Sequence, residues 1–117
     1  MEQQLMTSEL ENKLKEFKLY SQEGKGKQAK VIAHYFLANM DWYVLEGNKE
    51  GEDFRFFGIT DFHNDFGPEY GYFMLSDLKG TFNMPIIING KQTTLPVMIE
   101  RDVYWEEKSV DECEIFV

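Results

Sequence analysis

The dipeptide Asn89-Gly90 constrains the fold more than any other local feature, because it lies between two runs of β-forming residues. A two-residue turn with the twist that antiparallel strands need requires positive φ at both central positions, and asparagine and glycine tolerate this best. The residues from Ile86 to Leu95 are therefore predicted to form a β-hairpin with a type I′ turn. The chain must contain antiparallel β-structure.

Three further segments are predicted to be strands, since each is rich in β-branched and aromatic residues. They are Val31–Leu37, Trp42–Glu46 and Phe54–Thr60. Their short connections predict an antiparallel meander. The apolar groups Val97–Ile99 and Val103–Trp105 predict one more strand around the polar residues between them.

The residues before the first strand have a different pattern. Leu10, Leu14 and Phe17 recur at helical spacing, which predicts an amphipathic helix over Ser8–Leu19 with Thr7 or Ser8 as its cap. A single helical turn is predicted at 76–80. Together these elements predict an α+β fold, in which an N-terminal amphipathic helix packs on a mostly antiparallel, meander-type sheet with a short additional helix.

The length of 117 residues corresponds to one ordinary domain. We divide it into an N-terminal helix at 1–20, a flexible loop at 21–30, a sheet at 31–106 and an acidic tail at 107–117. The loop prediction depends on two glycines and the lack of apolar residues between Ser21 and Gln28.

The formal net charge of -9 decides which partners the chain can attract. Residues 1–30 carry six lysines against five glutamates, whereas the remainder carries six basic against sixteen acidic residues. This acidity argues against direct binding of nucleic acid and against a polybasic membrane surface. A lone cysteine, Cys113, and the lack of an apolar leader or membrane span predict a cytoplasmic protein without a disulfide framework.

Twelve aromatic residues lie between Tyr35 and Phe73, which is many for so small a domain. Either most of them form the core with a few tyrosines at its edge, or some form a patch that binds another protein. The sequence leaves both readings open.

The best candidate for metal chemistry is Asp61, His63 and Asp65, with Glu69 nearby. Alternate residues of an extended segment share a face, so these side chains would point toward one ion. The same composition is common in solvated loops, and no second histidine or cysteine stands at ligand spacing. We therefore predict no metal and no cofactor, and we assign no catalytic residue.

A set of short motifs occurs in order along nearly the whole chain. The motifs are Leu19-Tyr20-Ser21, Trp42-Tyr43-Val44, Glu46-Gly47, Asp53-Phe54, Phe56-Phe57-Gly58, Pro68-Glu69, Gly71-Tyr72-Phe73, Leu75-Ser76-Asp77-Leu78, and Leu95-Pro96 with Glu100-Arg101-Asp102-Val103-Tyr104. In these motifs the chain resembles the small bacterial family known as domain of unknown function 2958. Relative to that family, the Phe82–Thr94 hairpin is an insertion and the C-terminal tail lies beyond the match. The resemblance implies an accessory protein of a conjugative element, plasmid or phage, without an assigned activity.

The charge and the resemblance together predict a non-enzymatic protein that binds another protein. The specific hypothesis is an inhibitor of a host defence nuclease, of the restriction or CRISPR type, whose acidic face occupies a basic nucleic-acid channel. The residues predicted to bind this partner are Glu46, Glu50, Glu52, Asp53, Asp61, Asp65 and Glu69. The alternatives are a metal-dependent enzyme or small-molecule binder at Asp61, His63 and Asp65, and a module that self-associates through the tail 115–117.

Overall fold

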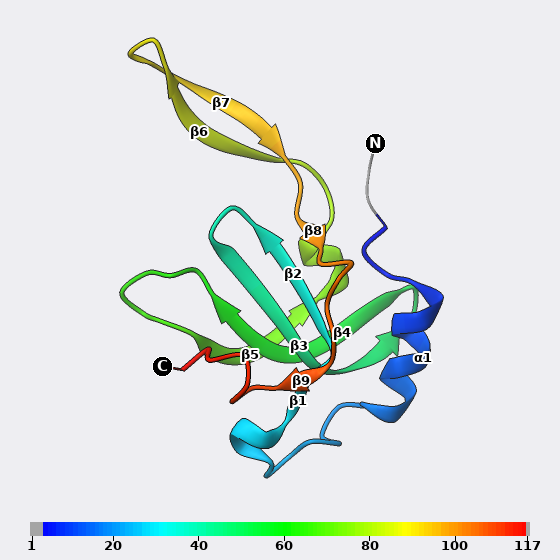
Figure 1. Cartoon of the computed structure of the whole chain (residues 1–117). Helices are drawn as coiled ribbons and strands as arrows, with labels where there is room; N and C mark the ends of the chain where they lie inside the picture. Colours follow the sequence, from blue (N-terminus) through cyan, green and yellow to red (C-terminus); the bar gives the residue numbers. More distant parts are fainter. Residues whose placement is uncertain (1–3, 117) are drawn as a thin grey trace.

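A five-stranded antiparallel sheet forms the centre of the computed structural model, which describes residues 4–116 (Figure 1). The order of its strands is β5-β4-β3-β2-β8. Their bounds are β2 (Ala33–Leu37), β3 (Met40–Glu50), β4 (Asp53–Asp61), β5 (Glu69–Met74) and β8 (Glu100–Arg101). One α-helix accompanies this mostly antiparallel sheet, so the predicted α+β class is confirmed.

The other elements lie around the sheet, and two of the strand pairs form separate ribbons. They are α1 (Ser8–Glu16), the short 3-10 helices η1 (Gly26–Gln28) and η2 (Leu75–Leu78), and the strands β1 (Lys30–Val31), β6 (Phe82–Ile88), β7 (Lys91–Val97) and β9 (Lys108–Ser109). Strand β1 pairs with β9, and β6 pairs with β7. The β6–β7 hairpin projects away from the sheet (Figure 1).

Helix α1 begins at a cap and ends earlier than the sequence predicts. The Thr7 hydroxyl accepts a hydrogen bond from the Leu10 N–H at 3.1 Å, which satisfies one of the free donors of the first turn. The helix ends at Glu16 because Phe17 leaves helical geometry, and its carbonyl accepts from the Gly47 N–H of β3. The predicted extension to Leu19 is therefore wrong.

Two hydrophobic clusters cover opposite faces of the sheet, because successive residues of a strand point to opposite sides. On β4, Phe56 belongs to the first cluster and Ile59 to the second. The first cluster includes Leu10 and Leu14 of α1. The second includes Val110, which the segment after β9 brings to the sheet.

The strand predicted across 97–105 is wrong except at its centre, since Val97 ends β7, Met98 and Ile99 are in no strand, and the residues after Arg101 are not extended. Only Glu100–Arg101 pairs with β2, and the chain then turns. The Asp102 side chain causes this turn, since its carboxylate accepts from the Tyr104 N–H at 3.1 Å. Aspartate favours such local turns over a continued strand.

The segment 21–30, predicted as a flexible loop, is bonded to the sheet through Gln22. This side chain is 4% exposed, and its amide donates to the carbonyls of Lys30 and Leu45 at 2.8 and 2.9 Å. Its oxygen accepts from the Lys30 N–H at 2.6 Å. A buried polar residue therefore holds this segment in place. The prediction of a flexible loop considered only apolar residues and so missed it.

The segment 107–116, predicted as an acidic tail, packs against the body of the protein. Val110 is 1% exposed, and the Phe116 ring stacks on Tyr70 with 5.2 Å between centroids. Of the predicted self-association segment, Ile115 and Phe116 are half-buried against the second cluster, while Val117 lies outside the described residues. Within residues 4–116, no helix has the length and apolar character needed to cross a membrane.

Candidate functional site

Two of the seven acidic residues predicted to face a partner are buried, and this corrects their assignment. Glu46 is 5% exposed and Asp61 is 7% exposed. The Glu46 carboxylate accepts hydrogen bonds from the backbone N–H groups of Tyr20 and Gln22, each at 2.7 Å. This carboxylate therefore anchors the loop to β3 and does not face solvent.

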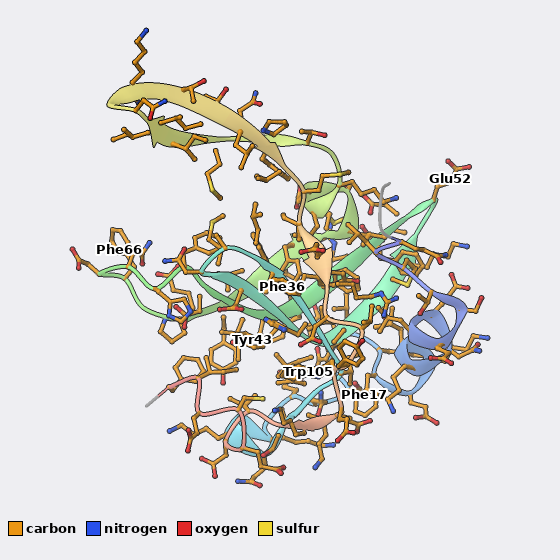
Figure 2. All side chains as sticks on the ribbon, turned by 45° about the horizontal axis from the view of Figure 1, so that its top comes forward. Phe17, Phe36, Tyr43, Glu52, Phe66 and Trp105 are labelled. Atoms are coloured by element: carbon orange, nitrogen blue, oxygen red, sulfur yellow. The ribbon has the colours of Figure 1, made fainter. Side chains whose placement is uncertain are left out.

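The other five acids are divided between the two ends of the sheet. Glu50, Glu52 and Asp53 lie at the turn between β3 and β4, whereas Asp65 and Glu69 follow the far end of β4. A nine-residue strand such as β4 spans about 27 Å. In Figure 2, Glu52 and Phe66 mark these two opposite ends. The predicted acids do not form one continuous face.

Two of these five acids already have partners within the chain. Glu50 forms an ion pair with Arg55 at 3.1 Å. Hydrogen bonds from Ser76, together with one from the Phe54 N–H, hold the pKa of Asp53 below its usual value. These contacts stabilise the β3–β4 turn and its junction with η2.

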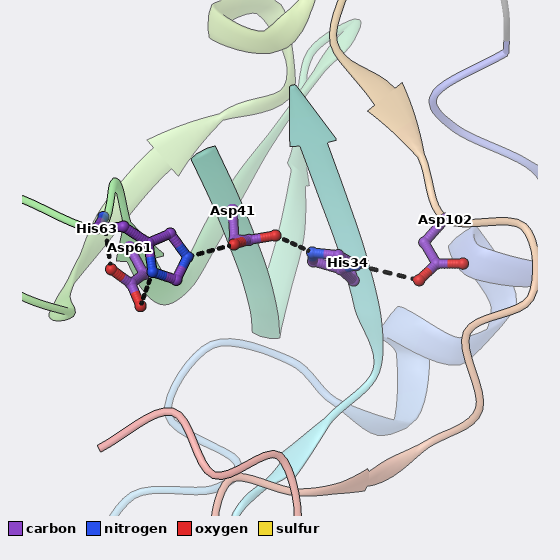
Figure 3. A network of polar contacts seen from close by, with 5 residues as sticks. All are labelled: His34, Asp41, Asp61, His63 and Asp102. Carbon is purple, nitrogen blue, oxygen red and sulfur yellow. Dashed lines mark hydrogen bonds and ion pairs between the residues drawn. The ribbon is translucent and has the colours of Figure 1, made fainter. Parts of the chain in front are cut away.

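Two histidines and three aspartates form a chain of polar contacts across the sheet (Figure 3). His34 Nδ1 lies 3.1 Å from Asp102 Oδ2, and His34 Nε2 lies 2.7 Å from Asp41 Oδ1. The second oxygen of Asp41 lies 2.9 Å from His63 Nε2. His63 Nδ1 is 3.7 Å from Asp61 Oδ2.

Strand register explains why this chain forms. Asp41 on β3 lies directly opposite Asp61 on β4, and two like charges in that position repel each other. The His63 ring lies between the two carboxylates and offsets this repulsion. The hydrogen bond with Asp41, reinforced by the charges of both aspartates, raises the pKa of His63 above its usual value.

The surroundings of His34 determine what this chain can do. Its ring stacks on Tyr43 at 4.8 Å and contacts Trp105 at 5.2 Å. Both nitrogens lie within hydrogen-bond distance of carboxylate oxygens. His34 therefore offers no free nitrogen for acid–base catalysis, and the arrangement is that of a structural ion network.

The predicted metal candidate does not assemble. Among residues 4–116, no group of three or more histidine, cysteine or acidic side chains has a geometry that would hold a metal ion. The His63 ring separates the carboxylates of Asp41 and Asp61, while Asp65 lies in the exposed loop beyond β4. Burial raises the pKa of the Cys113 thiol, which disfavours the nucleophilic thiolate.

The most distinctive surface belongs to the β6–β7 hairpin. Cross-strand partners share a face, so Phe82, Met84, Ile86 and Ile88 lie on one side together with Leu95 and Val97. We call this set the apolar hairpin face. The opposite side carries Ile87 between polar and proline residues.

The body of the protein leaves much of the apolar hairpin face exposed, although Met84, Ile86 and Val97 are half-buried. No residue of β6 or β7 is buried, and the exposed fractions of Ile88 and Leu95 are 54% and 46%. Water therefore reaches both sides of the ribbon. This face was not among the predicted site residues, although the alternation from Phe82 to Ile88 is visible in the sequence.

Taken together, the fold and these surfaces define a small α+β protein with an internal ion network and a projecting apolar hairpin. Comparison of the chain with protein families, with curated proteins and with solved structures finds no match. The resemblance to domain of unknown function 2958 therefore stays a prediction.

Proposed function

We propose that this protein acts by binding another protein, and that the β6–β7 hairpin is the element that docks. The observation that carries this proposal is the exposure of much of the apolar hairpin face. A two-stranded hairpin alone is marginally stable in water, and it gains stability when another surface covers its apolar side. Contiguous exposed apolar residues mark interaction sites in soluble proteins.

The charge distribution supports a partner with a basic surface. Between Leu78 and Ile99 the chain has two lysines and no acidic residue, so the remainder of the chain carries a net charge of -11. An acidic body beside an apolar hairpin fits a partner in which an apolar groove adjoins a basic area. The long-range attraction between such surfaces accelerates association and weakens as salt is added.

Nucleic-acid-processing enzymes have basic surfaces of this kind, because they bind the phosphate backbone through lysine and arginine. We therefore propose a non-enzymatic inhibitor of a host defence nuclease, of the restriction or CRISPR type. This class is also the one that the predicted resemblance to a mobile-element family implies. The hairpin would fix the position of the inhibitor, and the acidic body would exclude the phosphate backbone from the channel.

Cleavage assays with a panel of purified restriction and CRISPR nucleases test this proposal. The key variant is Ile88→Asp/Leu95→Asp, which places two charges on the apolar hairpin face. The matched control is Ile87→Asp, which makes the same change on the opposite side of the same hairpin. We expect the parent protein and the control to inhibit at least one nuclease at low salt, and the double variant to lose inhibition at least tenfold.

Two results would contradict the proposal. If no nuclease is inhibited or bound at low salt, the class of partner is wrong. If the double variant inhibits as well as the control, the hairpin is not the docking element.

A further inference from the structure

A small aromatic pocket lies on the sheet face opposite α1, between the loop at 20–26 and strands β3 to β5. Its volume is about 300 Å³. Glu46, Phe57 and Tyr72 occupy one row across β3, β4 and β5 and therefore share this face. Ligand pockets of about 300 Å³ are at the small end of their size range, so this pocket fits a single head group.

Four aromatic rings belong to its wall. The rings of Phe57 and Tyr72 meet at 60° with 5.1 Å between centroids, which makes a corner of two ring faces. Tyr70 stacks on Phe57 at 6.0 Å, and Tyr20 completes the lining from the loop. The exposed fractions of Tyr20, Tyr70 and Tyr72 are 66%, 47% and 52%, which is unusual for rings so close to a core.

The loop side of the pocket is held in an otherwise unfavourable conformation. Tyr20 has a φ of 74°, a left-handed value that a bulky residue adopts only when its surroundings impose it. The Glu46 carboxylate imposes it, because it binds the Tyr20 and Gln22 N–H groups at 2.7 Å each. A hydrogen bond also joins the side chains of Tyr20 and Tyr72. The aromatic wall is thus formed before any ligand arrives.

The electrostatics of the pocket favour a cation. Two carboxylates, Glu46 and Glu23, are part of its lining, which contains no basic side chain. The Glu46 oxygens accept from the neutral backbone N–H groups of Tyr20 and Gln22. Arg55, which lies two residues before Phe57 on β4, is paired with Glu50 at 3.1 Å. The faces of aromatic rings attract ammonium groups within about 6 Å.

We propose that this pocket binds the alkylammonium group of a lysine side chain, plain or methylated, presented by the partner protein. The ammonium group sits in the corner of Phe57 and Tyr72, beneath Tyr20, with its charge directed toward Glu46. The source of the lysine rests on the proposed function, since a protein with a basic surface supplies such side chains. The proposal that the pocket binds an ammonium group does not depend on the proposed role of the β6–β7 hairpin.

Titrations followed by the amide NMR signals of Phe57, Tyr70 and Tyr72 test the pocket without any partner. The probes are choline and its neutral isostere 3,3-dimethylbutan-1-ol, which have the same shape and differ in charge. We expect saturable binding of choline at millimolar concentration, at least threefold tighter than that of the alcohol. Equal binding of both probes, or no saturable binding of choline, would overturn the proposal.

Two variants test where the ammonium group binds, and two peptides test whether a lysine side chain supplies it. We expect Tyr72→Leu to weaken choline binding at least threefold. We expect Tyr104→Leu, at a tyrosine that is 89% exposed and lies outside the pocket, to leave it unchanged. Equal effects of the two substitutions would refute the assigned pocket. The blocked peptide acetyl-Gly-Lys-Gly-amide is expected to shift the same signals, and acetyl-Gly-norleucine-Gly-amide, which has no ammonium group, is not. Failure of the lysine peptide alone would overturn the lysine source, and none of these results depends on nuclease inhibition.

Discussion

Replacing Glu46 by alanine removes the contact that joins the loop at 20–22 to strand β3. Its carboxylate is 5% exposed and accepts two backbone hydrogen bonds at 2.7 Å. A hydrogen bond to a charged group contributes about 1.5–3 kcal/mol, and a buried donor left without a partner has a further penalty. Part of this gain is offset by the burial of the charge. We therefore expect Glu46→Ala to lower the free energy of unfolding by about 3–5 kcal/mol.

Urea denaturation followed by far-UV circular dichroism measures this loss. Glu52→Ala, at an exposed position of the β3–β4 turn, is the control and should change stability by less than about 0.5 kcal/mol. Glu46→Gln keeps the size of the side chain, but its NH₂ group faces one of the two N–H donors. We expect the free energy of unfolding of Glu46→Gln to lie between those of Glu46→Ala and Glu52→Ala. A loss below about 1 kcal/mol for Glu46→Ala would refute the anchoring role.

Three further predictions concern the sheet and the ion network. Gly58→Ala places a Cβ 1.8 Å from the Tyr43 carbonyl oxygen, so we expect urea denaturation to show a free energy of unfolding lower by at least about 3 kcal/mol. Its control is Gly71→Ala, at the facing position on β5, where the added Cβ meets open space. This control should lower the free energy of unfolding by about 1 kcal/mol or less. Tyr35→Phe removes the hydrogen bond to the Leu5 carbonyl at 2.6 Å and should lower stability by about 1–2 kcal/mol, and an unchanged urea midpoint would contradict this. Because the folded state raises the pKa of His63, its stabilising effect is complete below the unfolded value of 6.5 and is lost as pH rises through the folded pKa. NMR titration should show that Asp41→Asn lowers this pKa, and an unchanged midpoint would exclude Asp41 as its cause.

Local chemistry allowed much of the fold to be predicted. Asn89 and Gly90 adopt φ values of 50° and 77°, as the type I′ turn requires, because this preference depends on two residues alone. The strands of the meander were likewise recognisable from their β-branched and aromatic residues. The class of the fold followed from these elements.

The ion network and the divided acids were not predictable by the same means. Asp41 meets His34 and His63 only because β3 pairs with β2 and β4 in one particular register. The bulge between Val44 and Glu46 shifts that register within β3, and a shift of one residue moves every side chain to the other face. Composition shows that Glu46 is acidic, but it does not show which way its side chain points.

The two hydrophobic clusters imply an order of assembly as the chain is synthesised. The first cluster uses residues from Leu5 to Ile99, whereas the second also requires Val110. One face of the sheet can therefore pack while the other still exposes Val31, Leu45 and Ile59. Nascent chains with such open apolar surface tend to aggregate. A chain interrupted before Val110 would lack the part of the second cluster that Val110, Cys113, Ile115 and Phe116 supply, so that face of the sheet would stay only partly covered.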